Sequence, residues 1–334
     1  MELRLRAADD FHIHLRNDER TPHALSALRS GGTARALVMP NTAPAVSTGE
    51  EAASYRWFLE GFQSDCEFLM TIKLSPTTTP QLIYDAVSHG VIAGKQYPDG
   101  VTTNSENGVR NVKDLFPVYE AMQSVDMVLS LHGEVPGVFV MDAESAFLAD
   151  LQAIHSNFPQ LRIVLEHIST RAAVEQIQAM GDNVTATITD HHLAITLQDV
   201  VGSRLQPHHF CMPVAKRPED RRALIDIVKK GHPSFFSGTD SAPHFREEKE
   251  SACGCAGVFT SSIHMALLAH LFNKEDMISR LGDFTSTFGA EFYQLEQLNK
   301  EIVLINKSMV IEESLGGIVP FWYGRTLDFS LVPE

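Results

Sequence analysis

The chain has 334 residues, of which 44% are hydrophobic and 21% are charged, values close to those of ordinary globular proteins. Its formal net charge of −15 disfavours binding to nucleic acid or to an anionic membrane surface, because both carry phosphate. The four cysteines, the lack of an apolar run long enough to span a membrane and the lack of an apolar signal core at the N-terminus predict a soluble, cytoplasmic protein.

Short β-rich runs alternate with longer helical patterns along the chain. The first seven β-rich runs are at 6–13, 35–39, 67–73, 91–95, 127–131, 163–167 and 184–189. Each is followed by one helical pattern, and in the same order these patterns are at 22–30, 48–61, 80–89, 112–123, 143–157, 171–180 and 219–230. An eighth run at 234–238 precedes a helical pattern at 256–271. This alternation predicts βαβ units and a parallel sheet, and eight units fit an α/β fold of the (β/α)8 barrel type.

The tail of the chain has a different character. Residues 302–305, 308–313 and 316–321 predict irregular extensions packed on the barrel. We therefore expect a single barrel domain over residues 1–334, with a C-terminal extension after about residue 282.

Potential metal ligands follow the ends of several predicted strands. His12 and His14 end the first run, and side chains two residues apart point to the same face of a strand, so both imidazoles can reach one metal. A single His-x-His pair is a weak signal. It gains support from Lys95, His132, His167 and Asp240, which end or follow the fourth, fifth, sixth and eighth runs, where a barrel carries its active site.

Lys95 is an unusual residue for such a set. An ammonium group has no lone pair and repels a cation, so Lys95 can act as a ligand only when it is deprotonated or modified. Reaction with carbon dioxide would convert its amine into an anionic carbamate that is able to bridge two metals.

The motifs around these residues resemble those of the dihydroorotases of the monofunctional, single-barrel type in the amidohydrolase superfamily. They are DFHIHLR at 10–16, MPNT at 39–42, GKQYP at 94–98, TTNSENGV at 102–109, LHGEV at 131–135, LEHIST at 165–170 and the long GTDSAPHFREEKESACGCAGVF at 238–259. The resemblance extends from the first strand to about Gly257. It implies a zinc-dependent, reversible hydrolysis of the cyclic amide of dihydroorotate to N-carbamoyl-L-aspartate, a step of pyrimidine biosynthesis.

The resemblance also implies roles for individual residues. A binuclear centre of two Zn²⁺ ions per subunit would be held by six residues, with carboxylated Lys95 bridging the ions: His12, His14, Lys95, His132, His167 and Asp240. Asp240 would also be the catalytic base and acid, moving a proton from water to the departing ring nitrogen.

Substrate contacts follow by resemblance as well. Arg16, Asn41 and His244 would bind the substrate carboxylate, and the planar guanidinium of Arg16 suits this task. Backbone groups of Met212 and Ala256 would hold the ring amides. Residues Thr102 and Thr103 match a loop that closes over the substrate. The small molecule is the expected partner, together with a second copy of the chain in a homodimer.

Other histidines and cysteines are less convincing as ligands. His191-His192 and His208-His209 are adjacent pairs, and adjacent side chains on a strand point to opposite faces, which predicts structural or solvent-facing roles. The pair Cys253 and Cys255, even with Cys211, lacks the four ligands and the wider spacing typical of structural zinc, so packing is the favoured interpretation.

Two alternatives remain open at this stage. A hydantoinase or allantoinase would share the metal ligands, but it would have no need of Arg16, Asn41 and His244 to grip a carboxylate. A non-catalytic barrel that serves as a scaffold would be expected to have lost one or more ligands, whereas all six are present.

Overall fold

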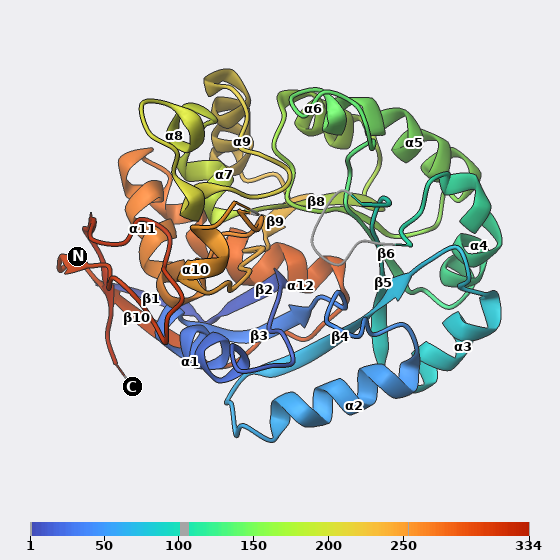
Figure 1. Ribbon diagram of the computed structural model, residues 1–334, viewed down its shortest axis with the longest axis horizontal. Coiled ribbons are helices and arrows are strands. Elements are labelled where there is room, and N and C mark those ends of the chain that lie inside the picture. Colours follow the sequence, from blue (N-terminus) through green and yellow to red (C-terminus); the bar gives the residue numbers. More distant parts are fainter. Residues whose placement is uncertain (1, 101–106, 253, 334) are drawn as a thin grey trace.

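The β-rich runs form one parallel sheet in the computed structural model, which describes residues 2–100, 107–252 and 254–333. Each strand is hydrogen-bonded to the next in chain order, and the sheet forms a ring at the centre of the molecule (Figure 1). The strands are β2 (Ala8–Ile13), β3 (Thr33–Val38), β4 (Glu67–Leu74), β5 (Val91–Gln96), β6 (Val128–Leu131), β7 (Ile163–Leu165), β8 (Val184–Ile188) and β9 (Phe235–Ser237).

The last strand meets the first through backbone hydrogen bonds just beyond β9. The amide of Asp240 donates to the carbonyl of His12 at 2.8 Å, and the amide of His14 donates to the carbonyl of Ser241 at 3.0 Å. Gly238 makes this approach possible, because a Cβ atom there would lie 2.9 Å from Cβ of His12. The predicted (β/α)8 barrel is thus confirmed, and its seam lies between two predicted ligands.

Helices cover the outside of the ring (Figure 1). The longer ones are α1 (Thr21–Gly31), α2 (Gly49–Glu60), α3 (Pro80–Ser88), α4 (Phe116–Ser124), α5 (Ala143–Asn157), α6 (Arg171–Ala179), α9 (Pro218–Lys230) and α11 (His264–Lys274). Their starts follow ordinary capping chemistry: Thr48 and Glu51 form a capping box at α2, and Thr170 caps α6. Shorter elements are α7 (Asp190–Ala194), α8 (Gln198–Val201), α10 (Arg246–Lys249), α12 (Phe288–Phe292), η1 (Val112–Leu115), η2 (Pro207–His209), η3 (Ser261–Ile263), η4 (Ile278–Arg280) and η5 (Asp283–Thr287).

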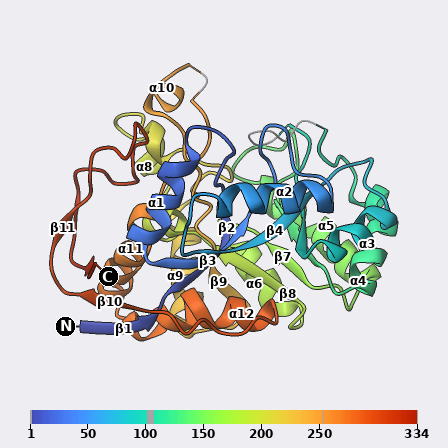
Figure 2. The ribbon, with the colours of Figure 1, turned by 90° about the horizontal axis from the view of Figure 1, so that it is seen from below.

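The inside of the barrel is a separate apolar core. Its side chains come from successive strands and include Phe11, Leu37, Val128, Val164 and Phe236. Ala290 of α12 and the following Tyr293 pack against them. Figure 2 shows α12 across one end of the barrel and α8 and α10 toward the other. The interior is therefore filled at the end near α12, and polar side chains are left to gather at the opposite, carboxyl end.

Two expectations about the C-terminal third need correction. The helix expected from residue 256 begins at His264, because the preceding residues are tied to Ser241: Val258 forms a β-bridge with it, and its hydroxyl accepts from the amides of Thr260 and Ser261. The tail is also more regular than predicted: β10 (Glu301–Ile305) pairs with β1 (Glu2–Arg6) and β13 (Ser330–Leu331), and β11 (Met309–Val310) pairs with β12 (Thr326–Leu327).

Within the described parts of the chain, no helix is both long and apolar enough to cross a membrane.

Candidate metal centre and substrate cavity

The six predicted ligands all lie at the carboxyl ends of barrel strands. Lys95 lies within β5, and the other five lie at or shortly after the ends of β2, β6, β7 and β9: His12, His14, His132, His167 and Asp240. All six are at most 8% exposed. Strand direction alone brings them together, because parallel strands deliver their carboxyl ends to one face of a barrel.

Three of them converge on a common point. The ligand atoms of His12, His14 and Asp240 lie within 4.8 Å of one another. Asp240 Oδ1 lies 3.0 Å from Nε2 of His14 and 3.4 Å from Nε2 of His12. A single cation placed among them could be bound by two imidazoles and one carboxylate.

The other two histidines continue the cluster. The ring centroid of His167 lies 5.0 Å from that of His12 and 4.7 Å from that of His132. Nδ1 of His167 is buried and has no hydrogen-bond partner among the described residues. The five predicted ligands other than Lys95 thus form one continuous group. Nδ1 of His167 is one ring nitrogen of this group that still lacks a partner among the described residues.

Unusual backbone conformations occur within this site. Arg16, His167 and Asp240 have positive φ angles of 60°, 43° and 48°. Such angles cost non-glycine residues about 1–3 kcal/mol each and persist where surrounding contacts enforce them. The contacts here are short: the amide of His167 donates to Oγ1 of Thr187 at 2.7 Å, and Asp240 is held by the carbonyl of His12.

Two buried glutamates lie beside ligand rings. Glu166 Oε2 lies 2.9 Å from Nδ1 of His12, and Glu134 Oε2 lies 2.8 Å from Nε2 of His132. A carboxylate only accepts, so the hydrogen bond to Glu134 places the proton of His132 on Nε2 and leaves the lone pair on Nδ1. For His12 and Glu166 only the short distance is established, because Nδ1 of His12 has no hydrogen-bond partner among the described residues.

Lys95 is fully buried, and its Nζ atom has no hydrogen-bond partner among the described residues. Burial lowers the pKa of Lys95 from 10.5 to about 8. The ring of Tyr97, which the sequence analysis did not single out, lies 5.3 Å from Nζ and also lines the cavity. A buried amine with no fixed partner and easy access to its neutral form is able to react with carbon dioxide, as the predicted carboxylation of Lys95 requires.

The protonation states of the other ligands agree with metal binding. Burial lowers the pKa of His14 to about 4 and that of His167 well below its usual value, so both rings are neutral near pH 7. Burial alone would raise the pKa of Asp240, but the hydrogen bond with His14 and the nearby His12 hold that pKa below its usual value. Neutral imidazoles and an ionised carboxylate are the forms that bind a divalent cation.

A small cavity is lined by five of the predicted ligands, all except Lys95. Besides the ligands, its wall contains four of the predicted substrate contacts, namely Arg16, Asn41, Met212 and Ala256. Arg16 is only 6% exposed, so a buried cation lies in the same cavity as the metal ligands. Thr102 and Thr103, predicted to belong to a closing loop, lie outside the described residues.

His244 does not line the cavity, but it contacts a residue that does. Its Nε2 atom lies 3.1 Å from Nη2 of Arg16. The carbonyl of Pro243 accepts from Nε of the same guanidinium at 3.3 Å. The segment that follows Asp240 therefore holds Arg16 in place.

The interpretation of the pair His191-His192 assumed that both residues lie on a strand, and this assumption was wrong. His191 and His192 lie in α7 and not on a strand, their ring centroids are 4.6 Å apart, and both are buried. Thr189 caps this short helix. His208 and His209, in η2, point to different partners, the carboxylate of Glu250 and the carbonyl of Asp199.

Comparison with known proteins gives a consistent result. The chain is 41% identical to a probable dihydroorotase of Schizosaccharomyces pombe, with 98% of each chain covered, and 40% identical to the dihydroorotase of Vibrio cholerae, with 97% of each covered. The structure of a Saccharomyces cerevisiae dihydroorotase in complex with 5-fluoroorotic acid matches with a TM-score of 0.94, at 35% identity over 99% of this chain and 98% of the other. An L-hydantoinase from Arthrobacter aurescens shares the fold, with a TM-score of 0.84 at 15% identity over 99% of this chain and 83% of the other. No protein-family model matches the sequence.

Proposed function

The chain belongs to the dihydroorotase family of metal-dependent hydrolases, and from this premise we propose that it hydrolyses the cyclic amide of (S)-dihydroorotate reversibly to N-carbamoyl-L-aspartate in pyrimidine biosynthesis. The resemblance noted from sequence motifs is confirmed by relatives that match over nearly the full chain. The observation that carries the assignment is the buried Arg16 in the wall of the cavity that also contains the metal ligands.

The residues at the carboxyl ends of the strands fit a binuclear zinc centre. His12, His14 and Asp240 would hold one ion, His132 and His167 the other, and carboxylated Lys95 would bridge the two. The unpartnered Nζ of Lys95 and Nδ1 of His167 support this set, because both are buried polar atoms that lack a protein partner among the described residues. When bound, the two ions polarise the amide carbonyl and lower the pKa of water, so that a nucleophile exists near neutral pH.

The remaining residues of the cavity bind and orient the substrate. Arg16, Asn41 and His244 bind the exocyclic carboxylate, and His244 also supports Arg16 through the 3.1 Å contact. The backbone of Met212 and Ala256, on the opposite loops, holds the ring amides. Thr102 and Thr103, which lie outside the described residues, are assigned to substrate contact by resemblance alone.

Asp240 transfers the proton. Its carboxylate is ionised and therefore able to accept the proton of the attacking water. It then donates that proton to the ring nitrogen as the C–N bond breaks, which returns the carboxylate to its starting state. In the biosynthetic direction the same steps run in reverse, and the ring and water are formed.

The competing functions fit less well. The likeness to a hydantoinase, at 15% identity, concerns the fold alone. A hydantoin ring has no exocyclic carboxylate to occupy Arg16, and a buried guanidinium without an anion would be costly. A scaffold without activity would have no reason to keep six buried ligand side chains at the strand ends.

Assembly and location are proposed on resemblance alone. We expect one barrel domain, a homodimer and a cytoplasmic protein that does not bind nucleic acid. The charge of −15 supports the last point. Sedimentation of the purified chain would reveal a dimer or a monomer.

The test of the function is ring opening of L-dihydroorotate, followed in ultraviolet absorbance, before and after metal removal with a chelator. Turnover that disappears with the metal and returns with zinc is expected. Inactivity of the zinc-loaded protein on dihydroorotate, together with turnover of hydantoin or allantoin, would contradict the proposal.

A further inference from the structure

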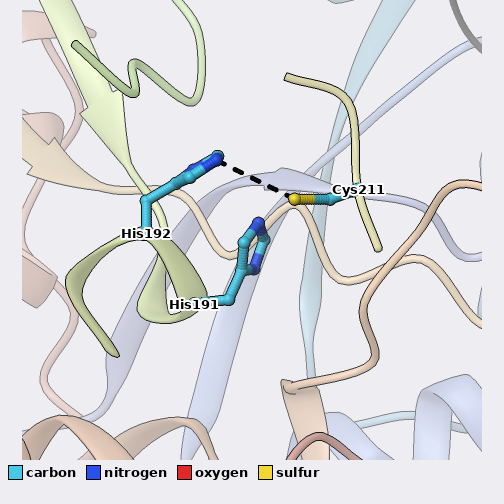
Figure 3. Close-up of side chains that lie close together, drawn as sticks. All are labelled: His191, His192 and Cys211. Carbon is cyan, nitrogen blue, oxygen red and sulfur yellow. Dashed lines mark hydrogen bonds between the residues drawn. The ribbon is translucent and has the colours of Figure 1, made fainter. Parts of the chain in front are cut away.

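A second group of potential metal ligands lies outside the cavity described above. His191 and His192 come from α7, and Cys211 comes from the segment after η2 (Figure 3). One ligand atom from each residue lies within 4.8 Å of the other two. All three side chains are at most 2% exposed. None of them is needed by the proposed reaction.

The spacing suits a tetrahedral cation. Sγ of Cys211 lies 3.8 Å from Nε2 of His192. Zinc bound at about 2.3 Å from sulfur and about 2.0 Å from nitrogen would place these two atoms roughly 3.5 Å apart, so a small movement would suffice. The carbonyl oxygen of Pro213 lies 3.0 Å from the same nitrogen and 3.1 Å from the sulfur, and it could occupy a fourth position.

His191 is the observation that calls for a ligand. It is fully buried, and neither of its ring nitrogens has a hydrogen-bond partner among the described residues. A buried polar group left without a partner destabilises the folded state. Figure 3 shows its ring directed toward Cys211, where a cation would satisfy one nitrogen.

Without a metal, the side chains of Cys211 and His192 make hydrogen bonds that they can give up to bind a cation. The thiol of Cys211 and Nε2–H of His192 both donate to the carbonyl of Pro213, and Nδ1 of His192 lies 2.9 Å from Oγ1 of Thr189. On binding, the thiol would lose its proton to solvent. The imidazole proton would move to Nδ1 and be donated to the Thr189 hydroxyl, which can also accept. One proton is released for each ion bound.

We propose that His191, His192 and Cys211 form a second metal site, separate from the binuclear centre, that binds one zinc-class divalent cation. Two imidazoles and one thiolate favour zinc and its first-row neighbours over hard ions such as Mg²⁺. Bound there, the cation links α7 to the segment that continues into Met212 in the cavity wall. Its role is to hold that wall in position.

Sulfur distinguishes this site from the binuclear centre, whose ligands supply only nitrogen and oxygen. The metal-free, full-length protein is titrated with Co²⁺ and its near-ultraviolet absorbance is recorded. We expect a strong sulfur-to-cobalt charge-transfer band that is absent from Cys211→Ser and present in Cys255→Ser, the matched control at a half-buried cysteine. After loading with Zn²⁺, Cys211→Ser should retain one ion fewer than the wild type.

A second variant tests the same site even if Cys211→Ser does not fold. His191→Gln retains the thiol and should weaken Co²⁺ binding at the sulfur-containing site at least tenfold. The proposal is overturned if saturated wild-type protein shows no charge-transfer band, if the band persists in Cys211→Ser, or if it disappears in Cys255→Ser. The charge-transfer band reports a sulfur ligand and not turnover, so the result for this site is independent of the dihydroorotase assignment.

Discussion

Nη2 of Arg16 lies 3.1 Å from Nε2 of His244, and both side chains are buried. A guanidinium can only donate, so Nε2 of His244 accepts and the ring proton lies on Nδ1. Burial, and then the charge of Arg16, lower the pKa of His244 to about 2, so His244 is neutral at every working pH. Arg16 therefore carries the positive charge of this pair, and the neutral His244 fixes the direction of the guanidinium.

The first prediction concerns Arg16→Gln. Loss of a charge-assisted interaction with the carboxylate, worth about 1.5–3 kcal/mol, should lower kcat/KM for dihydroorotate by about 10- to 100-fold, chiefly through KM. Steady-state kinetics would measure it. Arg222→Gln, which removes a half-exposed arginine of α9, is the matched control and should have wild-type values. An unchanged KM for Arg16→Gln would rule out the carboxylate clamp.

The second prediction concerns the bridging role of Lys95. Lys95→Ala should lose activity by about 1,000-fold, because the metals that supply several kcal/mol of charge stabilisation would no longer be held correctly. A short carboxylic acid such as acetate or propionate should restore part of the activity by occupying the vacated space. Activity of Lys95→Ala close to that of the wild type without any added acid would contradict the role.

The third prediction uses the pKa of Lys95 in the metal-free protein. Only the neutral amine reacts with carbon dioxide: an Nζ–C bond forms and one proton leaves. With a pKa of about 8, at constant dissolved CO₂, the rate of reactivation by CO₂ and zinc should rise about fivefold from pH 7 to 8 and less than twofold from pH 8 to 9. Lys95→Arg should not reactivate at any pH. A rate that keeps rising tenfold per pH unit to pH 10 would show an unperturbed lysine.

Much of this site could be expected from sequence, for a simple geometric reason. A parallel barrel delivers the ends of its strands to one face, so His12, His132 and Asp240 had to lie near one another once the strands were recognised. The positions of His191 and His192 could not be obtained in this way. Strand β8 ends at Ile188, and Thr189 caps a helix of one turn, so the alternation of side chains along a strand no longer applies.

Contacts between segments that are distant in the chain could not be predicted from the sequence either. Strand β10 contains a continuous apolar run at 302–305, but its partner β1 lies about three hundred residues earlier in the chain, and local pattern gives no pairing over that distance. The role of Lys249 is a similar case. In the sequence it is one charge in the run REEKE at 246–250, whereas in the fold it is only 3% exposed.

The fourth prediction follows from the contacts of Lys249. Its Nζ atom donates to the carbonyls of Phe210, Cys255 and Gly257 at 3.0, 2.6 and 2.7 Å, and so joins the two segments that carry Met212 and Ala256. Lys249→Met would remove all three of these hydrogen bonds and loosen that wall of the cavity, although the carbonyl of Phe210 would still accept from the amide of Gly257. We expect KM to rise about tenfold while zinc content at the binuclear centre stays unchanged. Lys230→Met, at an exposed lysine of α9, is the control.

Restoration of a low KM in Lys249→Arg, which keeps the charge and can still reach the carbonyls, would support a positioning role. A fall in kcat with unchanged KM in Lys249→Met would contradict it, because the substrate wall would then be intact.

The fifth prediction is a pH dependence of stability that arises at the buried pair of His264 and Asp190. His264 is fully buried, with Nδ1 2.9 Å from Oδ2 of Asp190. Burial opposes protonation of His264, but the charge of Asp190 and the hydrogen bond outweigh it and raise the pKa of His264 above 6.5. A histidine with a raised folded-state pKa stabilises the protein fully below pH 6.5, and this contribution is lost as the pH rises through the folded-state value.

Removal of the carboxylate should therefore matter most at low pH. We expect Asp190→Asn to lose about 3 kcal/mol of unfolding free energy at pH 6 and clearly less at pH 9, since breaking a buried pair costs about 3–5 kcal/mol only while both partners are charged. Denaturant titrations of the metal-free protein would measure this without a contribution from bound cations. Asp85→Asn, which removes the exposed partner of His89 on α3, should change little at either pH. An equal loss for Asp190→Asn at both pH values would mean that the carboxylate stabilises α7 as a hydrogen-bond acceptor and that His264 stays neutral.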